Sequence, residues 1–433
     1  MKLNTKRTLL VGLAFLAICA FWQMYDFIVP LVLKNNFGLS DTWSGVVMAM
    51  DNVLALFLLP FFGALSDRCT LPLGRRMPFI LFGSLAAAVL TSLLPAVIGA
   101  GSLVLFLVVL ALLLLAMGTY RSPAVALMPD VTPKPLRSKG NAVINLTGAV
   151  GGMIALGLVN VAVIKVAGPE GQALSDYRYI YWAIAALMVI CSIVLTLTIK
   201  ERSLVAEMEA IHYGESEEER RATREGGSGK LSKPAMRSLL LILCSVALWF
   251  MGYNAVTTAF SKYATTVWGV SEGAAARCVM LASVAAILSY WPVGIVSSKI
   301  GRKRMIQICV LLLCACFLAA GLFTQMSFIM YVLFALVGVA WASINVNSFP
   351  MVVELATGSD TGKYTGYYYT FSMAAQVLTP ILSGALMQYI GYHTLFPYAA
   401  LMVACSFVTM TLVRHGDSRP EAKKGLEALD VDD

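Results

Sequence analysis

Residues 102–116 read SLVLFLVVLALLLLA, and this stretch decides the fold class of the chain. Its apolar side chains follow one another almost without interruption, whereas a lipid-facing strand of a membrane barrel alternates apolar and polar positions over about 10 residues. A helix needs about 20 mostly apolar residues to cross the hydrocarbon core of a bilayer. We therefore expect residues 102–116 to lie inside a transmembrane helix.

Comparable apolar runs recur along the whole chain. Of its 433 residues, 59% are hydrophobic and only 13% are charged, whereas about 25% are charged in a soluble domain. The composition predicts an all-α membrane protein with twelve transmembrane helices. The expected spans are residues 8–33, 42–62, 77–98, 102–128, 141–166, 178–199, 238–262, 274–297, 305–325, 327–350, 364–390 and 393–413.

The distribution of cations predicts the orientation of the chain. The net charge of +8 does not indicate a nucleic-acid partner, because the cations follow alternate loops. Cytoplasmic loops of membrane proteins carry an excess of Lys and Arg. We therefore expect a multi-pass protein of the inner (plasma) membrane of a cell, monomeric in the lipid bilayer, with both termini cytoplasmic. Of the 32 Lys and Arg residues, those then outside the cytoplasm are Lys34, Lys165, Arg178, Lys262, Arg277 and, within a span, Arg121.

A polar stretch at residues 200–236 divides the chain into two sets of six spans. It mixes acidic and basic side chains and contains the sequence GGSG at 226–229, a composition typical of a linker. We expect an N-terminal six-helix bundle at 1–199, a cytoplasmic linker at 200–236, a C-terminal six-helix bundle at 237–413 and a cytoplasmic tail at 414–433.

The two bundles resemble each other in sequence. Residues 37–40 (FGLS) precede the second expected span, and residues 268–271 (WGVS) precede the eighth. Gly63 and Gly294 follow at the same offset from these tetrapeptides. Such ordered matches indicate an internal duplication. Many transporters are built from such repeats, with the solute site near the bilayer midplane between the halves.

The loop at residues 63–76 reads GALSDRCTLPLGRR, and the equivalent residues 294–304 read GIVSSKIGRKR. A carboxylate beside a helix N-terminus is stabilised by the helix dipole and can pair with arginines across a seam. We predict ion pairs here that hold one conformation, weaker in the second loop because Ser298 replaces the acid. The predicted gating residues are Gly63, Asp67, Arg68, Gly74, Arg75, Arg76 and Asp130.

These two loops resemble the signature of the major facilitator superfamily, which implies twelve transmembrane helices in two six-helix pseudo-repeats. A closer resemblance, over mostly the first 150 residues, lies in residues 66–80, SDRCTLPLGRRMPFI. This segment looks like the corresponding loop of the plant sucrose carriers and their animal proton–sugar symporter relatives, near the glycoside–pentoside–hexuronide cation symporters. The resemblance implies secondary active sugar transport driven by protons. Val125 and Leu110 stand where the plant carriers have an arginine and an acid, so sucrose itself is not implied.

Three charged residues lie away from the ends of the expected spans, namely Asp26, Asp51 and Arg121. Each costs about 2.5–3.5 kcal/mol at the centre of a spanning helix, so intramembrane charges mark functional sites. A carboxyl group in apolar surroundings can load and release a proton near neutral pH. Asp26 is thus a candidate coupling acid, sugar ligand or both, and Asp51 is the second candidate. Arg121 offers donors to sugar hydroxyls or competes for one of the two acids.

Sodium coupling is the alternative at Asp51 and its neighbour Asn52. The cation-binding acids of the melibiose carrier fall four and eight residues before the glycine that Gly63 resembles. Leu59 and Ala55 occupy those positions in this chain, so proton coupling is preferred.

Neutral polar side chains line the expected spans of the second half, and aromatic ones flank Asp26. An aromatic ring stacks on the apolar face of a sugar, and amides and hydroxyls bind its hydroxyl groups. Hydrogen bonding between helices is the competing explanation for these polar stripes. The predicted substrate-binding residues are Trp22, Tyr25, Asn52, Tyr253, Asn254, Asn345, Tyr369 and Gln376.

The sequence thus predicts a proton-coupled sugar or glycoside symporter that works by alternating access. The alternative within transport is a proton-driven antiporter that exports a drug or metabolite. A membrane enzyme or sensor is disfavoured, because none of the three histidines (His212, His393 and His415) lies in the interior of a span and no nucleophile–base pair is evident. The nine cysteines show no zinc or disulfide spacing, so we expect no metal and no cofactor.

Overall fold

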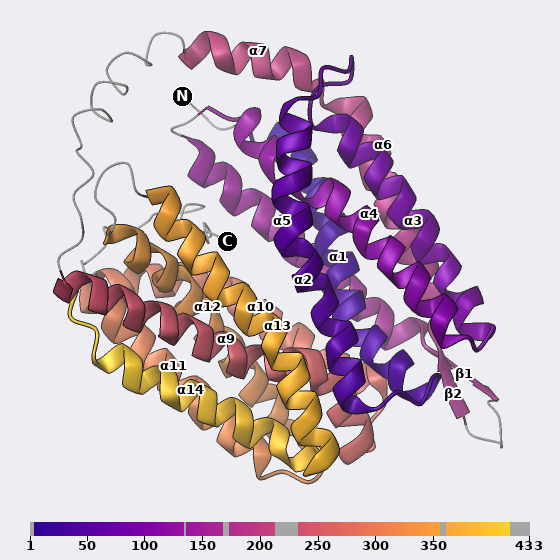
Figure 1. Ribbon diagram of the computed structural model, residues 1–433, viewed down its shortest axis with the longest axis vertical. Helices are drawn as coiled ribbons and strands as arrows, with labels where there is room; N and C mark the ends of the chain where they lie inside the picture. The colour runs from indigo at the N-terminus through magenta and orange to yellow at the C-terminus, as the bar shows by residue number, and fades with distance from the viewer. Residues whose placement is uncertain (1–3, 134–135, 168–172, 213–232, 356–360, 416–433) are drawn as a thin grey trace. The chain divides into compact units, whose positions relative to one another are not determined.

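The computed structural model describes residues 4–133, 136–167, 173–212, 233–355 and 361–415, and these are almost entirely helical (Figure 1). Twelve of the described helices are long and apolar enough to cross a membrane. Helices satisfy every backbone hydrogen bond within one segment, which the water-free bilayer core requires. The predicted all-α membrane fold is therefore confirmed.

The helices and strands follow one another along two compact units. Unit 1 comprises Met1–Ile211 and Val270–Met280, and unit 2 comprises His212–Gly269 and Leu281–Asp433. The elements are α1 (Thr5–Asn35), α2 (Asp41–Asp67), α3 (Met77–Gly99), α4 (Leu103–Asp130), α5 (Arg137–Ala162), β1 (Ile164–Ala167), β2 (Ala173–Asp176), α6 (Arg178–Thr198), α7 (Glu201–His212), α9 (Lys233–Val267), α10 (Glu272–Ile300), α11 (Arg302–Gly321), α12 (Phe328–Glu354), α13 (Thr361–Tyr389), the 3₁₀ turn η4 (Tyr392–Thr394) and α14 (Leu395–Thr411).

Helix α1 forms the core of unit 1. It packs against α2, α4, α5 and α6, while α3 packs against α4 and α6. Every residue from Phe27 to Leu33 is buried, as expected of a helix that is apolar on all sides. The half-buried Asp26 directly precedes this run, so its carboxyl group is held by the most enclosed helix of the unit.

The contact between α1 and α5 depends on glycine. A Cβ atom at Gly151 would overlap the backbone carbonyl of Leu16, and one at Gly148 would lie 2.8 Å from the Sγ atom of Cys19. Membrane helices associate through small residues that allow their backbones to approach closely, because lipid offers no hydrophobic driving force between them. Gly151 therefore sets the distance between α1 and α5.

Gly151→Ala is expected to lower the free energy of unfolding by about 3 kcal/mol, because backbone must move to make room for the methyl group. The matched control is Gly157→Ala in the same helix, where a Cβ atom meets nothing within 4 Å. That substitution should be neutral or stabilising by up to about 1 kcal/mol, since alanine favours the helix. Thermal unfolding of both variants in detergent measures the difference, and equal midpoints would contradict this account.

The expected span 141–166 is wrong at its C-terminal end. Helix α5 stops at Ala162, and β1 pairs antiparallel with β2, with Ile164 opposite Asp176 and Ala167 opposite Ala173. β-Branched residues in Ile164–Ala167 favour a strand over a helix. Figure 1 shows this hairpin at the opposite end of the unit 1 helices from α7.

The hairpin contacts the first turn of α10, which also belongs to unit 1. The Nζ atom of Lys165 lies 3.0 Å from Oε1 of Glu272, and the hydroxyl of Ser175 hydrogen-bonds the same carboxylate. A carboxylate in the first turn of a helix is further stabilised by the helix dipole. These contacts hold the hairpin against α10.

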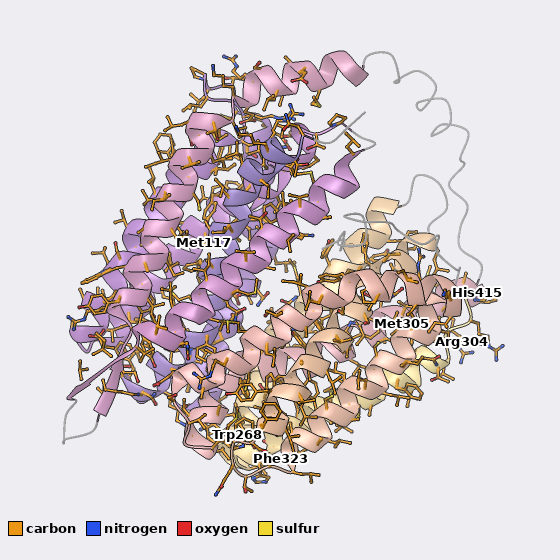
Figure 2. All side chains as sticks on the ribbon, turned by 180° about the vertical axis from the view of Figure 1, so that it is seen from behind. Met117, Trp268, Arg304, Met305, Phe323 and His415 are labelled. Atoms are coloured by element: carbon orange, nitrogen blue, oxygen red, sulfur yellow. The ribbon has the colours of Figure 1, made fainter. Side chains whose placement is uncertain are left out.

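Unit 2 is built around α9 and α14. Helix α9 packs against α13 and α14, and α11 packs against α12 and α14. At one end of the unit the indole Nε1 of Trp268 donates to the carbonyl of Phe323 at 3.0 Å, and both residues are labelled in Figure 2. A Cβ atom at Gly338 of α12 would overlap the carbonyl of Ala282 in α10, so close backbone approach recurs here.

Candidate functional site

The three intramembrane charges of unit 1 come from three helices that meet. Asp26 lies on α1, Asp51 on α2 and Arg121 on α4, and α1 packs against both α2 and α4. Each side chain is half-buried, and each interacts electrostatically with the other two. Among the described residues no hydrogen bond or ion pair joins Arg121 to either carboxylate. The arrangement is therefore a loose triad of two acids and one base.

Arg121 rests on an aromatic ring rather than on an acid. Its Cζ atom lies 5.4 Å from the ring centroid of Trp22, a cation–π contact that contributes about 0.5–2 kcal/mol. Trp22 and Tyr25 meet edge to face at 5.5 Å between centroids. The ring face of Trp22 under Arg121 is covered by the guanidinium, so a sugar would have to stack on the opposite face.

Two polar atoms beside the triad lack hydrogen-bond partners in the part of the chain that the structure describes. They are the indole Nε1 of Trp22 and the hydroxyl of Tyr25, and both atoms are buried. An unsatisfied buried donor costs about 1–3 kcal/mol, so a polar solute that reached these atoms would stabilise them. The amide of Asn52, by contrast, donates to Oδ1 of Asp51 at 2.8 Å.

Unit 2 holds an aromatic cluster on α9 and α12. Tyr253 of α9 and Trp341 of α12 stack with centroids 3.7 Å apart and planes inclined by 2°. Phe250 meets Trp341 edge to face at 5.0 Å. Aromatic rings of this kind offer flat apolar faces of the sort on which a sugar ring can stack.

Some of the polar side chains predicted to bind substrate in unit 2 donate hydrogen bonds to backbone carbonyls of their own helices. The amide of Asn254 donates to the carbonyl of Phe250 at 2.9 Å, and that of Asn345 donates to the carbonyl of Trp341 at 3.2 Å. Their amide oxygens retain acceptor capacity. Tyr369 and Gln376 on α13 are both half-buried, and the ring of Tyr369 lies 6.2 Å from that of Phe349.

The loop that joins α2 to α3 is an ion-pair network. Arg76 pairs with Asp67, and its Nε lies 3.0 Å from Oδ2 of Asp130 at the end of α4. Arg75 pairs with the other oxygen of Asp130 at 2.9 Å. Arg76 also donates to the carbonyl of Gly63 at 3.3 Å. Four of the seven predicted gating residues thus form one charged cluster, with Gly63 as an acceptor, whereas Arg68 is exposed.

Sequence reasoning missed Glu201, which completes this network. Its carboxylate accepts hydrogen bonds from the backbone N–H groups of Arg75, Arg76 and Met77 at 2.8–3.1 Å. Glu201 is only 1% exposed, and it begins α7, the helix that follows α6. The acid therefore caps the N-terminus of α3. In the sequence, Glu201 is one of several acids in the polar stretch 200–236, and nothing there indicates its role.

Gly74 makes room for this cap. Its φ of +118° lies in a region that L-residues other than glycine rarely adopt. A Cβ atom at Gly74 would overlap Oε2 of Glu201 and lie 2.5 Å from its Cδ atom. Gly74 and Glu201 therefore act as a pair in the loop.

The sequence matches a known family over nearly its whole length. The family described as MFS/sugar transport protein covers residues 10–413. The sucrose transport protein SUC3 of Arabidopsis thaliana is 30% identical over 139 residues, which is 28% of this chain and 23% of that protein. Proton-associated sugar transporter A of Homo sapiens is 40% identical over 68 residues, 16% of this chain and 9% of that protein. The chain thus matches less than a quarter of the length of these relatives.

Solved structures show the same fold. A bacterial homologue of the human lysosomal transporter Spinster, inward-facing and unoccupied, superposes with a TM-score of 0.64 at 15% identity, and the match covers 95% of both chains. The peptide transporter POT in complex with sulfate gives a TM-score of 0.67 at 13% identity, over 94% of this chain and 93% of that chain. At these identities the likeness establishes the architecture only.

Proposed function

Since the chain belongs to the MFS/sugar transport protein family, we propose that it carries a sugar or glycoside together with protons, by alternating access. The family and the fold make it a multi-pass membrane transporter rather than an enzyme. The observation that carries the proposal of proton coupling is the triad of Asp26, Asp51 and Arg121 inside the apolar helices of unit 1.

The charge of the triad gives the coupling a physical basis. With both acids ionised, two carboxylates and one guanidinium carry a net charge of −1. One bound proton makes the triad neutral. Charge in a low-dielectric interior is costly unless it is compensated, so the neutral state is the one suited to closing around a neutral sugar. The proposal therefore predicts one proton per transport cycle.

Hydrogen-bond donors suit a sugar, whose hydroxyl oxygens accept hydrogen bonds, better than a lipophilic cation. Trp22 and Tyr25 offer unsatisfied donors beside the triad, and the Tyr253–Trp341 stack offers flat apolar faces. Pyranose rings pair such faces with hydroxyl groups that need hydrogen-bond partners. The names of the two matched relatives, a sucrose transporter and a proton-associated sugar transporter, favour the same solute and the same driving ion.

The network around Arg76 suits the proposed gate. Its ion pairs join the ends of α2, α3 and α4, and Glu201 adds the start of α7. The excess of cations in these loops favours a cytoplasmic position for this end of unit 1. We propose that these pairs hold one conformation and loosen in the other.

Uptake into vesicles tests the proposal. The purified chain, reconstituted into proteoliposomes, is expected to accumulate one of a panel of radiolabelled mono- and disaccharides when the lumen is alkaline. Collapsing the gradient with a protonophore should end the accumulation. Sugar efflux on imposing the same gradient would favour the antiporter instead. If no sugar is moved and lipophilic cations raise the unfolding temperature, the sugar assignment fails.

A further inference from the structure

The two units differ in whether carboxylates pair with their basic side chains. In unit 1 two arginines of the α2–α3 loop are compensated, because Asp130 pairs with Arg75 and Arg76 and Asp67 pairs with Arg76. In unit 2 no carboxylate occurs among the side chains that the structure describes. Exposed cations nevertheless gather at one end of that unit.

Three exposed arginines come together at the ends of three helices. We call them the basic cluster: Arg237 on α9, Arg304 on α11 and Arg414 just after α14. Helix α14 packs against both α9 and α11. Figure 2 labels Arg304 and His415 at the same end of unit 2.

Hydrogen bonds hold the ends of these helices together beside each arginine. Lys303 donates to the carbonyls of Thr411 at 3.1 Å and Val413 at 2.6 Å, which ties α11 to the end of α14. The hydroxyl of Ser238 on α9 accepts from the backbone N–H of Arg414 at 3.3 Å and lies 2.9 Å from Nδ1 of His415. Each arginine of the cluster therefore lies next to, or takes part in, a hydrogen bond that joins two of these helix ends.

Exposed apolar side chains lie near each arginine, on α9, on α11 and at the end of α14. Ile308 and Leu311 lie one and two turns from Arg304 and are 56% and 51% exposed. Leu240 lies one turn from Arg237, and Leu412 and Val408 precede Arg414, each at least half exposed. On α9 and α11 the spacings of three, four and seven residues place these apolar side chains on the same helix face as the arginine. The surface is therefore cationic at its end and apolar along its length.

We propose that the basic cluster binds the phosphodiester headgroup of an anionic phospholipid, whose acyl chains lie along the apolar faces of α9, α11 and α14. The guanidinium groups supply planar donors that match phosphate oxygens. Clusters of cations at the ends of transmembrane helices attract anionic lipids. A soluble phosphate would use the arginines and leave the apolar part of the surface without a role.

A lipid titration tests the proposal without reference to transport. The full chain in neutral detergent is titrated with a short-chain phosphatidylglycerol, with phosphatidylcholine of the same chain length and with glycerol 3-phosphate, and thermal unfolding is followed. Only phosphatidylglycerol is expected to raise the unfolding temperature. In the triple variant Arg237→Gln/Arg304→Gln/Arg414→Gln, its half-saturating concentration should rise at least about tenfold.

The matched control removes the same charge from unit 1. Lys6, Lys200 and Arg202 are exposed, and Lys6→Gln/Lys200→Gln/Arg202→Gln should stay within about twofold of the wild type. A triple Arg→Lys variant at the cluster, which keeps the charge, should retain most of the preference and guards against a folding defect.

Four outcomes would overturn the proposal. They are an equal effect of phosphatidylcholine, an equal effect of glycerol 3-phosphate, an equal loss in the unit 1 control, and a preference that emerges only when residues 416–433 are deleted. The last outcome would make the acidic end of the chain the partner of the cluster.

Discussion

Asp26→Asn is expected to abolish the accumulation of sugar against its gradient while leaving downhill uptake intact. The remaining pair, Asp51 and Arg121, is neutral without a proton, so the carrier can cycle uncoupled. A gradient of about two pH units supports about 100-fold accumulation at one proton per sugar, because each unit is worth about 1.4 kcal/mol. The variant should reach an accumulation ratio of about 1.

The net charge of the triad also predicts how other substitutions in it should affect uphill and downhill transport. Asp51→Asn should resemble Asp26→Asn, because either acid can serve as the partner of Arg121. The double variant Asp26→Asn/Asp51→Asn leaves the guanidinium uncompensated, so both uphill and downhill transport should be lost. Arg121→Gln leaves two acids that need two protons, and its uptake should shift toward lower pH.

Asp41→Asn is the matched control, because Asp41 lies in the first turn of the same helix as Asp51. It should accumulate sugar as the wild type does. The readout is radiolabelled uptake into proteoliposomes, measured with the gradient imposed and again with the gradient collapsed. If Asp26→Asn and Asp51→Asn both accumulate sugar like the wild type, the coupling assignment is wrong.

Glu201→Ala is expected to produce the second large effect, a loss of about 3 kcal/mol in the free energy of unfolding. The substitution leaves three backbone N–H groups at the start of α3 without their acceptor. Unsatisfied buried donors cost about 1–3 kcal/mol each, and partial access of water reduces the sum. Denaturant titration in detergent micelles measures the loss.

Gly74→Ala should destabilise the same loop through a different cause. An alanine at a φ of +118° is strained, by about 1–3 kcal/mol, and its methyl group displaces the carboxylate of Glu201. Because both substitutions break the same cap, Gly74→Ala/Glu201→Ala should cost less than the sum of the single variants, by about 1–2 kcal/mol.

Gly101→Ala separates backbone strain from the loss of the cap. Gly101 has a φ of +68°, and a Cβ atom there meets nothing within 4 Å, so the substitution should cost about 1 kcal/mol. Strict additivity of the Gly74 and Glu201 variants would show that the carboxylate does not depend on the glycine, and would contradict the proposed pairing.

The chain's apolar runs were sufficient to predict the helical architecture. A run such as residues 102–116 leaves no polar side to face water, and a bilayer leaves helix as the one way for a single segment to satisfy its backbone. The apolar character of a segment and its ability to satisfy its own backbone hydrogen bonds are both local properties, so the sequence determines them. The loop at 63–76 likewise carried the family resemblance, which the match over residues 10–413 confirmed.

Partners distant along the chain were decided by the tertiary structure. Nothing near Glu201 in sequence indicates that its carboxylate caps α3, because its hydrogen-bond partners lie 124–126 residues away. The same holds for Arg121, which faced two acids in the sequence argument but lies over the ring of Trp22. The end of α5 at Ala162 was missed because the apolar run continues into a strand whose stability comes from pairing with β2. Composition and periodicity determined which segments enter the membrane, and packing alone decided which side chains meet there, since contact energies depend on neighbours that the local sequence does not contain.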